Sequence, residues 1–234
     1  MNRGRPKLLD LFCCEGGAAL GYDRAGWDVL GVDLDPRFAK RYPFRFVAAD
    51  AIEFVTLFSH EFDAIHASPP CQHASIATSS IDRSKYPHLI EPTRDALVAS
   101  GLPYIIENVK GAALRNPLVL CGSMFDLTAT DDDGTLVRLE RHRLFESNIL
   151  LHAPRPDFHD KAVQVAGSYG GARRDKIEAR QVRHGGYVPS IPVQQRLLGI
   201  DWMTQHGMHQ SLPPAYTEWL GAQLLAHIES EAVA

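Results

Sequence analysis

The chain has few cysteines and no long apolar run. Its four cysteines, two of them adjacent at Cys13 and Cys14, show neither metal-ligand spacing nor the pattern of a disulfide framework. We therefore expect no bound metal, and we expect the protein to reside in a reducing cytosol. No stretch approaches the roughly 18 apolar residues of a membrane span. The basic N-terminus, Met1 to Lys7, has no apolar segment behind it, so we infer neither export nor a membrane anchor.

An excess of positive charge is also missing. The formal net charge is −4, which is mildly unfavourable for a nucleic-acid-binding protein, although the placement of basic residues matters more than their total. With 234 residues, 45% hydrophobic and 22% charged, the composition is that of an ordinary globular protein. This length suits one large domain, alone or with a small appendage.

A proline turn carries the first candidate for chemistry. Ser68-Pro69-Pro70-Cys71-Gln72 directly follows the apolar run Phe62–Ala67. Each proline fixes its own φ and restricts the residue before it, so the pattern predicts a short strand that ends in a rigid turn. There a thiolate of Cys71 would be positioned as a nucleophile. The alternative is a small buried side chain, since free cysteines are often buried.

The N-terminal residues predict a ligand site. Leu8–Phe12 has the pattern of a buried strand, Cys13–Gly21 is rich in glycine, and Tyr22–Ala25 continue as a helix. Strand, glycine turn and helix are the layout of a nucleotide-cofactor site, because glycines allow close approach of a ligand to the backbone. The spacing G-G-x-x-x-G lacks the dinucleotide fingerprint. A tight turn without a ligand is the alternative.

Two further predicted strands end in acids. Trp27–Asp35 places Asp33 where a carboxylate accepts the ribose hydroxyls of an adenosine-containing cofactor. Phe46–Asp50 places Asp50 where a carboxylate meets the adenine amino group. Asp50 also precedes a predicted helix with Glu53 three residues on, a spacing that favours helix capping. The two roles of Asp50 are compatible.

A predicted helix over 91–99 and the strand Tyr104–Ile106 lead to another acid, Glu107. In an open parallel sheet, functional groups gather at the carboxyl ends of the strands. Five side chains would therefore line one edge: Asp10, Asp33, Asp50, Cys71 and Glu107. We predict an α/β fold with a Rossmann-like, doubly wound, mostly parallel sheet. The polar stretch 78–86 predicts a loop that closes over a substrate.

Four motifs in this order resemble those of the cytosine-5 DNA methyltransferases, which use S-adenosylmethionine. They are Asp10-Leu11-Phe12 with its Gly-Gly turn, Pro69-Pro70-Cys71-Gln72, Glu107-Asn108-Val109 and Arg141-His142-Arg143. The resemblance extends from Leu8 to about Phe145, and Leu212–Gly221 is similar to the family's last motif. Three positions depart from the family. Leu34 replaces a frequent aromatic residue, Leu139 replaces the leading glutamine of the arginine motif, and Met208–Leu212 replaces a Gly-Asn-Ser/Ala-Val element.

The resemblance implies a small DNA (cytosine-5-)-methyltransferase with a fold of the class I methyltransferase type and S-adenosyl-L-methionine as cofactor. It implies the following cofactor-binding residues: Asp10, Phe12, Gly16, Gly17, Asp33, Leu34, Asp50, Ala51 and Pro70. Double-stranded DNA is the implied partner. We expect a monomer in the cytoplasm of a bacterial or bacteriophage-infected cell, in a restriction-modification setting.

The chemistry assigns roles to four residues. C5 of cytosine is a poor nucleophile, and a thiolate added at C6, here Cys71, converts the ring to an enamine. A protonated Glu107 would hydrogen-bond N3 and the exocyclic amine as charge develops. Arg141 and Arg143, on one face of an extended strand, would hold the base carbonyl and a phosphate; a solvated charged strand is the alternative. Because a stacked base is out of reach, it must flip out.

Residues 161–196 form a basic segment in this acidic chain, with seven Lys and Arg against Asp175 and Glu178, a net charge of +5. Localised positive charge is what phosphate contact requires. The recognition arginines are Arg173, Arg174, Arg180 and Arg183. A disordered basic loop is the alternative. Relatives often have a much longer recognition region, so we expect a target of two to four base pairs.

We divide the chain into a catalytic and cofactor-binding domain over 1–147, a short target-recognition segment over 148–192, and C-terminal helices over 193–234 that pack back on the first domain. Two other functions remain open. One is the same chemistry on RNA or a free cytidine nucleotide. The other is a DNA- or cofactor-binding relative without turnover, against which the intact Cys71 and Glu107 argue.

Overall fold

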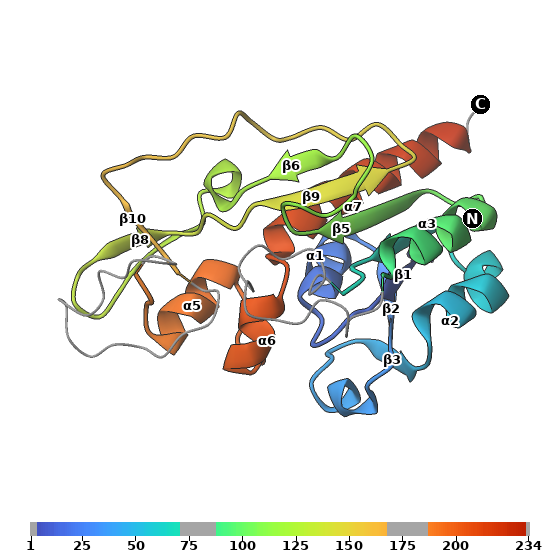
Figure 1. The fold of residues 1–234 in the computed structure, drawn as a ribbon, viewed down its shortest axis with the longest axis horizontal. Helices are drawn as coiled ribbons and strands as arrows, with labels where there is room; N and C mark the ends of the chain where they lie inside the picture. Colours follow the sequence, from blue (N-terminus) through green and yellow to red (C-terminus); the bar gives the residue numbers. More distant parts are fainter. Residues whose placement is uncertain (1–3, 71–87, 168–186, 233–234) are drawn as a thin grey trace.

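The computed structural model describes residues 4–70, 88–167 and 187–232 (Figure 1). Seven strands form a central sheet in the order β3-β2-β1-β4-β5-β9-β6. They are β1 (Lys7–Leu11), β2 (Asp28–Asp33), β3 (Arg45–Ala48), β4 (Ala64–Ala67), β5 (Tyr104–Asn108), β6 (Leu118–Leu120) and β9 (Arg143–Ser147). Neighbours from β3 to β5 are parallel, and β9 is antiparallel to β5 and β6. The predicted α/β fold with a mostly parallel sheet is confirmed.

The strand order reverses at β1. The chain passes from β1 to β2 and β3 on one side, then returns to place β4 and β5 on the other side. In such sheets ligands bind outside the carboxyl ends of the strands at the point of reversal. Asp10 of β1, Asp33 of β2 and Glu107 of β5 all stand at or next to these ends.

Helices cover both faces of the sheet. Strand side chains point alternately to the two faces, so Leu8 packs with α1 (Gly17–Ala25) and α7 (Pro214–Glu231) in one core. Leu9 packs with α2 (Ala51–Phe58) and α3 (Ile90–Ser100) in the other. Burial on both faces explains why these strands read as continuous apolar runs.

The C-terminal helix α7 docks directly on α1. The hydroxyl of Thr217 donates to the carbonyl of Ala18 at 2.8 Å, and the indole of Trp27 donates to the carbonyl of Gly221 at 3.0 Å. A Cβ at Gly21 would lie only 2.1 Å from the Pro214 carbonyl oxygen. Only glycine fits there, so the last helix of the chain supports the helix that follows the glycine turn.

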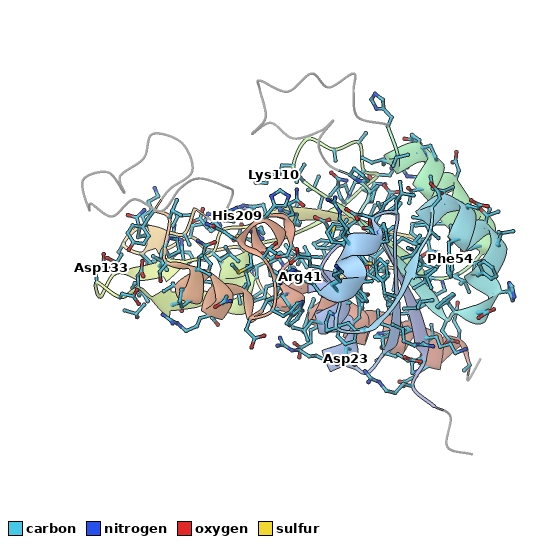
Figure 2. All side chains as sticks on the ribbon, turned by 90° about the horizontal axis from the view of Figure 1, so that it is seen from below. Asp23, Arg41, Phe54, Lys110, Asp133 and His209 are labelled. Atoms are coloured by element: carbon cyan, nitrogen blue, oxygen red, sulfur yellow. The ribbon has the colours of Figure 1, made fainter. Side chains whose placement is uncertain are left out.

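A small second sheet lies at one end of the molecule. Its strands, in the order β10-β8-β7, are β7 (Thr128–Thr130), β8 (Leu136–Arg138) and β10 (Gln164–Val165). They share a third core with α5 (Ile191–Leu198) and α6 (Gln205–Gln210). Figure 2 shows Asp133 at this end and Phe54 at the opposite end. The small sheet therefore combines β7 and β8, from the predicted catalytic domain, with β10, from the predicted recognition segment that begins at residue 148.

Short 3-10 helices complete the connections: η1 (Pro36–Lys40), η2 (Ser59–Glu61) and η4 (Gly122–Phe125). The buried Tyr42 follows η1 and lies over Gly31, where a Cβ would come within 2.3 Å of the ring. Among the helices that the structure describes, none is long and apolar enough to cross a membrane.

Candidate active site

A buried acid stands near the end of β1. Asp10 is 1% exposed, and its Oδ2 accepts a hydrogen bond of 3.3 Å from the Tyr42 hydroxyl. Its Oδ1 has no hydrogen-bond partner among residues 4–70, 88–167 and 187–232. Burial raises the pKa of Asp10 to about 8, although the Tyr42 hydrogen bond opposes the shift. A buried carboxyl group with an unused oxygen at a strand end suits a ligand that brings a donor.

The turn after β1 has an unusual backbone. Phe12 and Cys14 have φ values of 59° and 46°, and Gly16 has a φ of 90°. Left-handed backbone costs free energy in residues with a Cβ, and such strain gathers at functional sites. The backbone N–H of Cys14 donates to Asp33 Oδ2 at 3.1 Å. The turn is thus tied to the end of β2.

Asp33 closes β2 with both carboxylate oxygens in use. Besides the contact with Cys14, its Oδ1 accepts from the N–H of Asp35 at 3.0 Å. The following Leu34 has 73% of its surface exposed, an apolar side chain on the open edge of the sheet. The pair offers a carboxylate beside an apolar surface.

Asp50 caps helix α2. Its Oδ1 accepts from the N–H groups of Ile52 and Glu53, both at 2.9 Å. The capping interpretation is confirmed, and the adenine contact of this exposed carboxylate stays a prediction. Ala51, the first residue of α2, is buried.

Glu107 is a buried carboxyl group on β5. It is 8% exposed, and its Oε1 lies 3.0 Å from Nε of Arg143. Burial raises its pKa, while Arg143, a hydrogen bond from Ser68 and the charge of Arg141 oppose the shift without cancelling it. The group therefore takes up a proton more readily than an exposed glutamate.

A chain of hydrogen bonds leads to Glu107 from inside the protein. The fully buried His66 contacts the Tyr22 hydroxyl through Nδ1 and the Ser68 hydroxyl through Nε2, both at 2.9 Å. Ser68 in turn donates to Glu107. Burial lowers the pKa of His66 to about 3, so the ring is neutral. With Nε2 protonated, every donor points towards Glu107: Tyr22 to His66, His66 to Ser68, Ser68 to the carboxyl group.

The proline turn is held by the next motif. Nδ2 of Asn108 donates to the carbonyl of Pro69 at 2.9 Å, joining the Pro-Pro turn to β5 beside Glu107. Pro69 is buried and Pro70 is half-buried. Cys71, the predicted nucleophile, lies outside the described residues, as do all four recognition arginines.

The two arginines of the 141–143 motif have different surroundings. Strand β9 begins at Arg143, so only this arginine belongs to a strand, and it faces Glu107. Arg141 precedes the strand, is fully buried, and donates to the carbonyls of Met208 and Ser211 at 2.9 and 2.6 Å. The solvated charged strand is excluded, because both side chains are buried.

Residues 6–114 match the family model of the C-5 cytosine-specific DNA methylases. The matched segment, which is less than half of the 234 residues, is similar to that family. It contains the glycine turn, the proline turn with Cys71, and Glu107-Asn108-Val109. The type II methyltransferase M.XorII of Xanthomonas oryzae pv. oryzae is 29% identical over 122 residues, which cover 46% of this chain and 29% of that protein. The match thus spans less than a third of the length of this relative.

Three solved structures that share this fold are described as methyltransferases. A prophage-encoded E. coli protein, described as a candidate DNA modification methyltransferase, has a TM-score of 0.60 at 15% identity and covers 96% of this chain and 99% of its own. The S. pombe Dnmt2 methyltransferase has a TM-score of 0.58 at 12% identity, over 96% and 99%. Entamoeba histolytica EhMeth has 0.54 at 13%, over 97% and 99%. At such identities the likeness shows the fold, and the predicted class I methyltransferase type is confirmed.

The edge of the sheet at the ends of β1 and β2 offers groups that could hold a nucleoside cofactor. The Asp10 oxygen without a partner could accept from a donor of such a ligand, and Asp33 with the exposed Leu34 could contact its nucleoside part. The 208–212 segment, which departs from the family, still reaches this edge, because a Cβ at Gly17 would lie 2.8 Å from the carbonyl oxygen of Leu212.

Sequence reasoning missed several residues of this candidate site. His66 was overlooked because it lies within an apolar run. Its position two residues before Ser68 was a usable signal, because alternate residues of a strand point to the same face. Glu15 was considered only as part of the glycine turn. In the structure its carboxylate accepts hydrogen bonds from the N–H and the hydroxyl of Thr204, both at 2.8 Å. Tyr42 gave no sequence signal, because its contact with Asp10 depends on the fold.

Proposed function

We propose that this chain is a DNA (cytosine-5-)-methyltransferase that transfers a methyl group from S-adenosyl-L-methionine to C5 of a flipped-out cytosine. The observation that carries the proposal is the state of Glu107. It is a buried carboxyl group with a raised pKa at the strand edge, 3.0 Å from Arg143 and beside the proline turn that leads to Cys71. A carboxyl group of this kind can recognise and activate a cytosine ring.

Glu107 has two functions in this proposal. In its protonated form it donates to N3 of cytosine, and its other oxygen accepts from the exocyclic amine. Negative charge that develops on the ring during thiolate addition is stabilised by this donor and by the nearby guanidinium of Arg143. The hydrogen-bond chain from Tyr22 through His66 and Ser68 fixes the direction in which the carboxyl group points.

Cys71 supplies the electrons. Its thiolate forms a bond to C6, the C5–C6 π bond opens, and C5 becomes electron-rich enough to take the methyl group. A base then removes the proton from C5, the double bond re-forms, and the thiolate leaves C6. Asn108 contributes by holding the Pro69 carbonyl, so that the turn before Cys71 keeps its place next to Glu107.

The cofactor supplies an electrophilic methyl group on its sulfonium. Asp33 would accept the ribose hydroxyls, and Asp50 the adenine amino group. Asp10 would accept a hydrogen bond from the cofactor through its Oδ1, which has no partner among the described residues. The remaining backbone and apolar contacts with the cofactor would come from Phe12, Gly16, Gly17, Leu34, Ala51 and Pro70.

The recognition arginines would bind DNA phosphates. Arg141 supports this assembly from within, because it holds the 208–211 carbonyls and accepts, through its own carbonyl, the Tyr216 hydroxyl at 2.7 Å. We propose that residues 148–192 read the target and that the segment from 193 onwards belongs to the catalytic unit.

Bisulfite sequencing of DNA from cells that express the chain tests the proposal. We expect methylated cytosines in one short sequence context, none with Cys71→Ala, and at least a hundredfold fewer with Glu107→Gln. Glu61→Gln, which changes an exposed acid in η2, is the matched control and should methylate like the parent.

Transfer of labelled methyl groups to purified substrates separates the alternatives. Label in duplex DNA supports the proposal, whereas label only in RNA or dCMP would move the same chemistry to another substrate. Cofactor binding without transfer to any of the three would point to a protein without turnover and contradict the proposal.

A further inference from the structure

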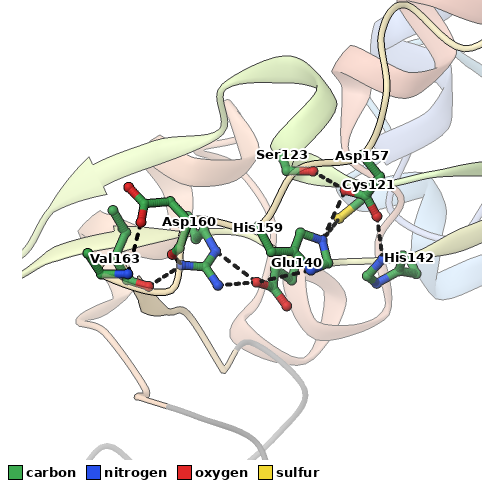
Figure 3. A network of polar contacts seen from close by, with 10 residues as sticks. Cys121, Ser123, Glu140, His142, Asp157, His159, Asp160 and Val163 are labelled. Atoms are coloured by element: carbon green, nitrogen blue, oxygen red, sulfur yellow. Dashed lines mark hydrogen bonds and ion pairs between the residues drawn. The ribbon is translucent and has the colours of Figure 1, made fainter.

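Four side chains with metal-binding atoms converge beside the central sheet (Figure 3). Cys121 follows β6, His142 precedes β9, and Asp157 and His159 come from the long connection between β9 and β10. One ligand atom from each residue lies within 4.8 Å of the others. We propose that these residues bind a structural zinc ion, a site that is independent of the cofactor and of the reaction.

The distances are those of a compact ligand set. His159 Nε2 lies 3.3 Å from Cys121 Sγ and 3.0 Å from Asp157 Oδ1, and His142 Nε2 lies 2.9 Å from Asp157 Oδ2. In tetrahedral zinc sites the metal–ligand bonds are about 2.0–2.3 Å, so neighbouring ligand atoms are roughly 3.3–3.8 Å apart. The four ligand atoms, which already lie within 4.8 Å of one another, would close around the ion to such separations.

The ligand chemistry favours zinc over other divalent ions. A thiolate with two imidazoles and a carboxylate is a mixed sulfur, nitrogen and oxygen set, whereas Mg²⁺ and Ca²⁺ prefer oxygen alone. A thiolate and a carboxylate together carry two negative charges, which balance the charge of Zn²⁺ in a partly buried place.

Second contacts orient these ligands. The Ser123 hydroxyl donates to Asp157, and Nδ1 of His159 lies 3.6 Å from Glu140 Oε1. Metal-bound histidines commonly have a carboxylate partner of this kind on their other nitrogen. Glu140 is itself held by Arg138, whose guanidinium also donates to the carbonyls of Asp160 and Val163. The site is therefore supported on the side facing the small sheet.

The position of the proposed zinc site fits a structural role. Residues 148–163 connect the two sheets without a helix or strand of their own. Such a stretch has little backbone hydrogen bonding to hold it, and a metal would join it to the ends of β6 and β9. His142 also stands between the two arginines of the motif, so the ion would fix the backbone at the start of β9.

This inference departs from our sequence-based expectation of no metal. The cysteine pattern gave no ligand spacing, because the ligands lie at 121, 142, 157 and 159 and only the fold brings them together.

Metal analysis of the full chain, purified without chelators or a metal-affinity step, tests the proposal. We expect about one zinc per chain, which Cys121→Ser and His159→Ala each reduce at least tenfold. His152→Ala removes an exposed histidine of the same connection and should keep the zinc, as should Cys71→Ala. Equal zinc in Cys121→Ser and the parent, or a parent without zinc, would overturn the site.

A spectroscopic test on the parent chain does not depend on the folding of a variant, and one conservative variant is added to it. Cobalt added to the chelator-treated parent should give the thiolate-to-cobalt charge-transfer band and the intense visible bands of a tetrahedral site. In Asp157→Asn, whose side chain is 29% exposed, the visible bands should change while the charge-transfer band persists. A cobalt spectrum without a thiolate band would contradict a site that includes Cys121. All readouts are independent of methyl transfer.

Discussion

The buried His66 makes stability depend on pH in a way that can be calculated. Its ring is fully buried between Tyr22 and Ser68, and burial lowers its pKa from 6.5 to about 3. In the unfolded chain the same ring takes up a proton below about pH 6.5. The unfolded state therefore binds more protons than the folded state across this window, and acidification destabilises the fold.

The linkage relation gives the magnitude. Between pH 8 and pH 5 protonation of His66 stabilises the unfolded chain relative to the folded state by about 2 kcal/mol, and by about 4 kcal/mol at pH 3, where the folded ring also takes up a proton. Asp10 acts in the opposite direction, because its raised pKa of about 8 means that its contribution is present at low pH and lost as pH rises through that value. The parent curve alone is a sum of both groups, so the diagnostic quantity is the difference from a His66 variant.

Urea unfolding at pH 8, 7, 6 and 5 measures this difference. We expect the parent to lose about 2 kcal/mol more than His66→Gln between pH 8 and pH 5. The variant has a constant penalty from altered hydrogen bonds with Tyr22 and Ser68, which cancels in the comparison. His152→Gln, at an exposed position, should follow the parent. Parallel curves for the parent and His66→Gln would show that His66 is not buried in its neutral form.

Three further predictions concern the proposed reaction. A 5-fluorocytosine oligonucleotide should form a covalent adduct with the parent and none with Cys71→Ala, since fluorine does not leave as a proton does; intact mass measures this, and active enzyme without an adduct would refute a thiolate mechanism. Asp33→Ala should weaken S-adenosylmethionine binding by about 1–3 kcal/mol in calorimetry, because bonds to a charged group are lost; unchanged affinity would place the ribose elsewhere. Alanine at one recognition arginine that contacts a phosphate should lower the slope of log affinity for DNA against log salt concentration by about 1. A variant with all four recognition arginines replaced by alanine that binds DNA like the parent at low salt would contradict this role of the segment, as would a methylated site of six or more base pairs.

Local patterns were sufficient to predict the five parallel strands of the central sheet and the positions of their acids. Alternating or continuous apolar residues define a strand over a few positions, and glycine or proline ends it, so Asp33 and Glu107 could be placed at strand ends from the sequence. The cap of α2 at Asp50 depends on neighbours only two and three residues away, and it was predicted for that reason.

Contacts between distant residues were decided by the tertiary structure. Cys121, His142 and His159 meet because β6 and β9 are neighbours in the sheet and the connection folds back over them. Arg141 binds the 208–211 segment because α7 returns to α1, a pairing that no local period encodes.

The surroundings of a charged group are also determined only by the tertiary structure. The sequence alone identified Glu107 as a candidate functional acid, whereas its raised pKa follows from burial in the folded sheet, which outweighs the opposing effects of Arg143 and of the hydrogen bond from Ser68. Chemical identity is local and was readable along the chain. Proton affinity depends on solvent exclusion and on partners from other strands, and only the folded sheet determines those.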